Sequence, residues 1–337
     1  MPRQRWRTRT TSPERSRVWW IGMLAGVLLA ASCTGGAGTS APSEGSAPGF
    51  PVSVQQEYGT AQLSAPPRRV VALMPTDLDI VIALGITPVA AFRDQFGQDG
   101  VPPWLAGRLD REKTKLVDLN NLSIEQLAAL RPDVILGGGP SLQPYRERLS
   151  QIAPLVGYEQ GYNVDSWQQR VTTLGKVLGV PDRARQLLAE TEKAVETAKS
   201  RFSALAGKTY TYTFAYTVDR MATIGDERNH TTQFLRQFGI APAPAVAKLE
   251  VGSAGSAVSQ EMLGLLDADL VLVGYPGADS RKALEAHPLF QQLNAVRRGT
   301  YLGIDINVTS ALQHPTVANI PWLIERLSPA FEKAAAG

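Results

Sequence analysis

Short aliphatic runs alternate with amphipathic stretches from about Ala61 onward. In the first half, strands are predicted over 68–74, 87–92 and 132–138, and helices over 77–86, 123–131 and 144–153. In the second half, strands are predicted over 208–216, 268–275 and 299–305, and helices over 230–239 and 259–267. Aliphatic strands that each lead into a helix are typical of a parallel sheet covered on both faces. The predicted fold class is therefore α/β.

One unit of this pattern occurs twice. SIEQLAALRPDVILG (123–137) and SQEMLGLLDADLVLV (259–273) align without a gap and share Ser, Glu, two Leu, Asp and a further Leu. The repetition predicts two lobes built on one plan, an N-terminal lobe over 61–180 and a C-terminal lobe over 206–337. Ser123 and Ser259 stand where a serine caps the start of a helix, and both are predicted to do so.

The segment between the lobes, Pro181 to Leu205, predicts one long helix. Apolar or small residues recur at steps of four and three and form a single stripe; they are Ala184, Leu188, Thr191, Val195, Ala198, Phe202 and Leu205. Asp182 near the start and Lys199 and Arg201 near the end suit the helix dipole. At about 1.5 Å per residue such a helix reaches from one lobe to the other. The alternative is a surface helix of a single domain.

The N-terminus predicts export. Six arginines precede an apolar run of 14 residues, Val18 to Ala31. Because a bilayer span needs about 20 residues, residues 1–32 are interpreted as a secretory signal peptide; the alternative is a membrane-anchor helix.

The only cysteine, Cys33, follows this run directly. Small residues before it resemble a bacterial lipobox, in which the cysteine becomes the lipidated N-terminus, although Ala30 stands where leucine is usual. Residues 33–60 are predicted to be a lipidated N-terminus followed by a flexible linker, since 34–49 contain almost only Gly, Ala, Ser, Thr and Pro.

The net charge of the chain argues against nucleic acid as a partner. The whole chain carries a formal net charge of +3, but the predicted signal peptide contributes most of its basic excess. The remainder is slightly acidic, so it has no overall positive charge to attract nucleic acid.

Three motifs together resemble a known family. RRVVALMPTDLDIVIALGI is similar to a family strand, then Pro-Ser-x-Thr-Glu, then a helix ending in Ala-Leu-Gly, with Thr76 in place of the Ser and Asp79 in place of the Glu. The repeated unit itself and HPLFQQLNAVRRGTYLGID (287–305) resemble two further family motifs. The family comprises the substrate-binding lipoproteins of ATP-driven (ABC) importers for iron–siderophores, cobalamin and haem, of the class III, helical-backbone type.

The resemblance implies two Rossmann-like lobes with parallel sheets, joined by one long α-helix, with a ligand cleft between them. It implies a non-enzymatic monomer, lipid-anchored on the outer face of the cell membrane, that delivers a ferric siderophore to an ABC permease dimer with its ATPase. Iron enters only within the siderophore, and no cofactor is expected. Haem, ferric citrate and cobalamin are alternative ligands, and a secreted α/β enzyme is a further alternative, although no nucleophile-and-base set is evident.

Candidate ligand contacts are Arg and aromatic residues near strand ends. Arg donates in bidentate fashion to anionic oxygens, and Trp and Tyr offer flat apolar contact. The candidates are Arg93, Trp104, Tyr145, Tyr216, Arg220, Arg228, Tyr275 and Arg281, with Tyr158, Tyr162 and Trp167 at the lobe junction. Arg93, Tyr216 and Arg220 rank first because each directly follows a predicted strand. Packing, or a solvated charge for Arg, is the alternative role.

The three histidines, His230, His287 and His314, all lie in the second half and are assigned structural roles. A site for a bare divalent metal is therefore not expected. In the family, a surface glutamate on each lobe meets arginines of the permease, and the resemblance assigns this docking role to Glu125 and Glu261.

Overall fold

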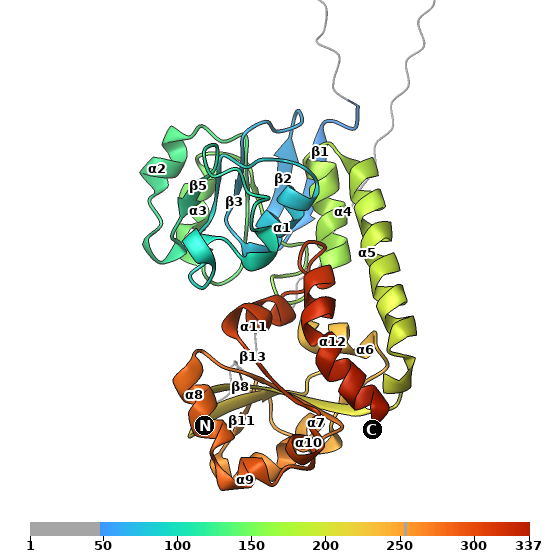
Figure 1. Ribbon diagram of the computed structural model, residues 1–337. Coiled ribbons are helices and arrows are strands. Elements are labelled where there is room, and N and C mark those ends of the chain that lie inside the picture. The colour runs from blue at the N-terminus through green and yellow to red at the C-terminus, as the bar shows by residue number, and fades with distance from the viewer. Residues whose placement is uncertain (1–47, 253–254) are drawn as a thin grey trace, which may run out of the picture. The chain divides into compact units, whose positions relative to one another are not determined.

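The computed structural model describes residues 48–252 and 255–337. These residues form two α/β lobes, each built around its own β-sheet, as Figure 1 shows. The predicted fold class is confirmed. The signal peptide, Cys33 and residues 34–47 of the predicted linker lie outside the described residues.

The N-terminal lobe contains a five-stranded, wholly parallel sheet in the order β5-β4-β3-β6-β7. Its strands are β3 (Val70–Ala72), β4 (Ala90–Phe92), β5 (Lys115–Val117), β6 (Val134–Leu136) and β7 (Leu155–Val156). The first of these strands in the chain lies at the centre, so the winding reverses between β3 and β6. Open α/β sheets bind ligands at such a reversal.

The helices of this lobe follow the predicted pattern. They are α1 (Pro75–Ala83), α2 (Ile124–Ala129), α3 (Arg146–Ser150) and α4 (Trp167–Val177). Pro75 begins α1, where a missing N–H costs nothing. Ser166 begins α4 in a reciprocal capping box with Gln169.

The last part of the predicted linker, residues 52–60, is wrong, because a β-hairpin begins there. β1 (Val52–Gln56) pairs antiparallel with β2 (Gly59–Leu63), and the Glu57 N–H donates to the Tyr158 carbonyl over 2.9 Å. Val54, Ala61 and Leu63 are buried. The folded part therefore begins before residue 60, because this stretch alternates apolar and polar residues with the period of a strand.

The C-terminal lobe contains a six-stranded mixed sheet. Its strands are β8 (Thr209–Thr217), β9 (Arg220–Ile224), β10 (Ala241–Pro242), β11 (Ser256–Val258), β12 (Leu270–Gly274) and β13 (Tyr301–Ile304). β8, β12 and β13 are parallel as predicted, whereas β9 pairs antiparallel with both β8 and β11. The sequence of β9, RMATI, lacks an aliphatic run such as the LVLVG of β12.

The remaining helices surround this second sheet. They are α6 (His230–Arg236), α7 (Pro244–Ala247), α8 (Ala278–Glu285), α9 (Pro288–Gln291), α10 (Asn294–Arg298), α11 (Ile306–Gln313) and α12 (Ile320–Ala336).

The repeated unit occupies equivalent places in the two lobes. Its strands, β6 and β12, each pair in parallel with the first major strand of their lobe, β3 and β8. The Ser123 hydroxyl accepts a bond from the Gln126 N–H, so the capping prediction holds there. For Ser259 it is wrong: the following turns, Gln260–Leu266, form a 3₁₀-helix and Ser259 makes no side-chain capping bond.

The linking helix is α5 (Pro181–Arg201), whose 21 residues extend about 32 Å. A 3₁₀ turn, Ser203–Leu205, completes the predicted range. α5 packs against α4 of the N-terminal lobe and against α12, and Figure 1 shows it running alongside both lobes. It is therefore a link between lobes and not the surface helix of a single domain. Within the described ranges, no helix combines the length and apolar character that a membrane crossing requires.

Candidate functional site

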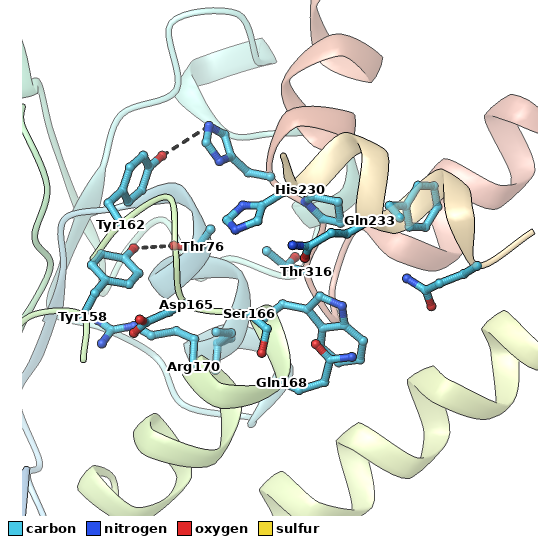
Figure 2. Close-up of a pocket in the computed structure, with 16 residues that line it drawn as sticks. Thr76, Tyr158, Tyr162, Asp165, Ser166, Gln168, Arg170, His230, Gln233 and Thr316 are labelled. Carbon is cyan, nitrogen blue, oxygen red and sulfur yellow. Dashed lines mark hydrogen bonds between the residues drawn. The ribbon is translucent and has the colours of Figure 1, made fainter. Parts of the chain in front are cut away.

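A cavity of about 610 Å³ lies between the two lobes. This volume is in the usual range for small-molecule sites. Four segments enclose it: α1, the chain leading into and through the start of α4, α6, and the turn between α11 and α12, as Figure 2 shows. The lining residues are Thr76, Ile80, Tyr158, Tyr162, Asp165, Ser166, Trp167, Gln168, Arg170, His230, Gln233, Phe234, Gln237, His314, Pro315 and Thr316.

Aromatic rings form one wall of this inter-lobe pocket. The Tyr158 and Tyr162 rings meet edge to face with centroids 5.3 Å apart, and Tyr162 lies 5.2 Å from the His314 ring. The Tyr158 hydroxyl bonds Thr76 Oγ1 at 2.7 Å, and the Tyr162 hydroxyl lies 3.3 Å from His314 Nε2. The wall therefore crosses from the first lobe to the second.

Arg170 is held by groups of the protein itself. Its Nε donates to Asp77 Oδ1 over 2.7 Å, its terminal nitrogens donate to the carbonyls of Val156 and Gly157, and its guanidinium stacks on the Tyr158 ring. Arg170 is 3% exposed and Asp77 is fully buried. Burial raises the pKa of Asp77, and the adjacent guanidinium opposes that rise.

The carboxylate of Asp165 holds the loop that carries Tyr162. It accepts hydrogen bonds from the backbone N–H groups of Glu159, Gln160 and Gly161. These bonds close the chain into a tight loop between β7 and α4. Both carboxylate oxygens of Asp165 are therefore bonded to the backbone of this loop, and they hold the pocket wall in place.

Two histidines face the pocket as neutral imidazoles. Burial lowers the pKa of His230, with Asp165 opposing the change. Burial, and after it the neighbouring His230, lowers the pKa of His314 to about 4. Near neutral pH both rings therefore offer a hydrogen-bond donor and an acceptor but no charge.

Asp79 fixes the turn that closes the pocket from the second lobe. Its carboxylate is buried and accepts bonds from Trp104 Nε1 at 2.8 Å, Thr316 Oγ1 at 2.5 Å and Asn319 Nδ2 at 3.3 Å. Burial raises the pKa of Asp79 to about 7, while the bonds from Thr316 and Trp104 oppose the rise. Asp79, which stands in place of the Glu of the family motif, thus joins α1 to the turn before α12.

None of the eight ranked cleft candidates is among the residues that line the pocket. Trp104 and Tyr275 are buried, the first bonded to Asp79 and the second to the Tyr301 hydroxyl. Burial and internal hydrogen bonds give these two the packing role that was the alternative prediction.

The other six candidates lie elsewhere on the lobes. Tyr145 packs partly buried against the core of the first lobe, and Arg93, directly after β4, is exposed. Arg220 stacks on the exposed Tyr216 ring at 4.8 Å. Arg228 and Arg281 pair with Asp226 and Glu285. Contact of these six with a ligand stays a prediction.

The residues named at the lobe junction, Tyr158, Tyr162 and Trp167, do line the pocket. His230 and His314, which were assigned structural roles, also line it, whereas His287 caps α9 by accepting from the Leu289 N–H. Within the described ranges, no three His, Cys, Asp or Glu side chains gather as a metal site. The sequence signal for these two histidines is their position: His230 begins α6 and His314 directly precedes Pro315, and both line the pocket.

The two predicted docking glutamates occupy equivalent exposed positions. Glu125 lies in the first turn of α2 and Glu261 in the first turn of the 3₁₀-helix that precedes β12. Glu125 pairs with Arg148 at 3.0 Å. The pKa of Glu125 is lowered by its own backbone N–H and by Ser123, and that of Glu261 chiefly by Ser259, so both are ionised near neutral pH.

Comparison with known proteins agrees with this architecture. Residues 70–305 match the family described as periplasmic binding protein. A Bacillus subtilis protein named as an ABC transporter substrate-binding lipoprotein, YhfQ, is 25% identical over 87% of this chain and 91% of its own length. The Fe(3+)-citrate-binding protein YfmC of the same organism is 24% identical over 85% of this chain and 89% of its own.

A solved structure shows the same fold. Streptococcus pneumoniae PiaA, crystallised in complex with ferrichrome, superposes with a TM-score of 0.70 at 23% identity, over 85% of this chain and 99% of PiaA. This chain therefore belongs to the periplasmic binding protein family, whose members are substrate-binding proteins.

Proposed function

We propose that this chain is an extracytoplasmic solute-binding protein that captures a ferric siderophore between its lobes and delivers it to an ABC permease. The observation that carries the proposal is the inter-lobe pocket, lined by aromatic rings and neutral polar groups in a member of the periplasmic binding protein family. Relatives named for ferric citrate and a fold neighbour bound to ferrichrome support a chelate of ferric iron as the cargo.

The pocket itself fits a bulky, already coordinated metal better than a reacting substrate. Several polar groups of the pocket are bonded within the protein: Thr76 to Tyr158, Tyr162 to His314, and Arg170 to Asp77. Burial raises the pKa of the Tyr162 hydroxyl and so keeps it protonated beside His314, which is the opposite of an activated nucleophile. We therefore propose a binding role without catalysis, in which iron is cargo within its chelate and no resident cofactor takes part.

Anchoring and partners complete the proposal. Cys33 carries the lipid that holds the protein on the outer face of the cell membrane, and a monomer presents Glu125 and Glu261 to the two subunits of the permease. Their equivalent, exposed positions on the two lobes support this assignment.

Tryptophan fluorescence tests the proposal, because Trp167 lines the pocket. The chain is titrated with ferrichrome, ferric citrate, ferric enterobactin, haem and cobalamin. We expect saturable quenching by at least one ferric chelate, with affinity in the micromolar range or tighter, and a smaller signal in Trp167→Phe. Binding of haem or cobalamin alone, or of nothing in the panel, would contradict the proposed function.

A further inference from the structure

The charge of the pocket lining limits the chelates that it accepts. Among the described residues that enclose the pocket, those whose side chains can carry a charge below pH 8 are Asp165, Arg170 and the two histidines; burial raises the pKa of Tyr158 and Tyr162 and keeps both neutral. Arg170 is the one permanent cation of this set, and its three donor nitrogens are already bonded to Asp77 and to two carbonyls. The pocket therefore presents no free positive charge to a ligand.

The remaining lining favours ligands that are neutral or positively charged. Trp167, Tyr158, Tyr162 and Phe234 contribute aromatic rings, whose electron-rich faces attract cations and repel anions. Gln168, Gln233 and Gln237 contribute amides, which both donate and accept hydrogen bonds without charge.

The histidines do not alter this balance. Both imidazoles are neutral near pH 7, because burial lowers their pKa values. A multiply charged anion that entered the pocket would lose hydration without gaining a cationic partner, which is costly.

From these contacts we infer that the pocket selects a ferric chelate with little or no net negative charge, of the hydroxamate type, and discriminates against polyanionic catecholate or citrate complexes. This inference rests on the proposed function and replaces the expectation of an arginine-lined cleft for anionic ligands. The outer surface of a hydroxamate chelate presents methylene chains and amide-like carbonyls. Aromatic rings and glutamine amides match both kinds of group.

Calorimetric titration with two probes tests the inference. Ferrichrome serves as a neutral trihydroxamate chelate, and ferric enterobactin serves as a tricatecholate chelate with several negative charges. We expect the chain to bind ferrichrome at least about tenfold more tightly. Equal or tighter binding of ferric enterobactin would overturn the inference and leave the proposed function intact, whereas binding of neither these nor ferric citrate would overturn both.

A positive charge introduced into the pocket should weaken its preference for the neutral chelate over the anionic one. Gln233 lies on α6 among the lining residues, where its Nε2 donates to the Arg228 carbonyl over 3.1 Å (Figure 2 labels Gln233 in the pocket wall). Gln233→Lys adds an ammonium there, so the ratio of the two affinities should move toward the anionic chelate by about tenfold or more. Gln292→Lys, an exposed position at the end of α9, adds the same charge outside the pocket and should leave the ratio unchanged. Thermal unfolding confirms that both variants fold; equal shifts in the two variants would overturn the role assigned to the pocket charge.

Discussion

At the scale of single residues, the hydrogen-bond partners of a charged side chain determine whether it can contact a ligand. Arg170 lies in the pocket wall, yet its guanidinium is bonded to Asp77 and to two backbone carbonyls and stacks on Tyr158. A buried ion pair of this kind is costly to break from one side, because the remaining charge loses its partner without regaining water. Arg170 therefore joins α1 to α4 and keeps the tyrosine wall in place.

Removing this guanidinium should destabilise the fold strongly. We expect Arg170→Met to lower the free energy of unfolding by about 3–5 kcal/mol, measured by urea denaturation. Arg183, whose side chain is 40% exposed and pairs with Glu190 at 3.5 Å, provides the matched control. Arg183→Met should change stability little, since exposed pairs contribute little. Similar stability losses in the two variants would show that the Arg170–Asp77 pair has no special role.

At the scale of elements, α12 joins the lobes as well as α5. Thr316 and Asn319, just before α12, bond to Asp79 on α1, and Trp322 on α12 lies with its ring centroid 5.3 Å from that of Trp104. The same turn contributes His314, Pro315 and Thr316 to the pocket. Asp79 thus fixes one pocket wall while it ties the start of α12 to the first lobe.

Truncation of Asp79 tests this connection. Asp79→Ala leaves Trp104 Nε1 and Thr316 Oγ1 without an acceptor, whereas Asn319 Nδ2 keeps its bond to the His314 carbonyl; each buried donor left unpaired costs about 1–3 kcal/mol. We expect a loss of stability of at least about 3 kcal/mol in urea denaturation and weaker chelate binding, because the 314–316 turn loses its anchor.

An exposed aspartate in the first turn of α8 serves as the control for this variant. Asp279→Ala should have little effect on either quantity. If Asp79→Ala unfolds at the same urea concentration as Asp279→Ala, the turn is held by other contacts.

At the scale of the whole described chain, two helices link the lobes, and each lobe carries one of two equivalent, exposed glutamates. Helices α5 and α12 pack against each other, and the turn before α12 is bonded to Asp79 of the N-terminal lobe. Glu125 and Glu261, at matching positions of the repeated unit, are the charges that we propose for docking to the permease.

The docking role predicts a separation of binding from uptake. Glu125→Gln with Glu261→Gln should leave chelate affinity unchanged, since neither residue lines the pocket, while iron uptake by cells that express the variant falls severalfold. Arg148→Gln is the control: it breaks the ion pair with Glu125 but keeps both carboxylates, so uptake should persist. Normal uptake by the double glutamine variant would leave these glutamates with only a local role at the starts of their helices.

The sequence by itself determined the two-lobed α/β plan, most of the parallel strands, the linking helix and the equivalence of the two repeated units. These features follow from the spacing of apolar residues over short stretches of the chain, which can be read from the sequence alone. The pattern was weaker for the hairpin at 52–63 and for β9, because short strands with few aliphatic residues resemble loops.

Only the tertiary structure decided which side chains form the pocket and which charges remain available in it. Thr76, Tyr162, His230 and His314 come from four distant segments, and no local pattern places them together. Ranking residues by their place after a strand favoured Arg93, Tyr216 and Arg220, whereas helix starts and the turn before α12 form the described pocket. Whether an arginine is free to meet a ligand depends on its partners in space, and Arg170 lies next to Asp77 only because the fold packs α4 against α1.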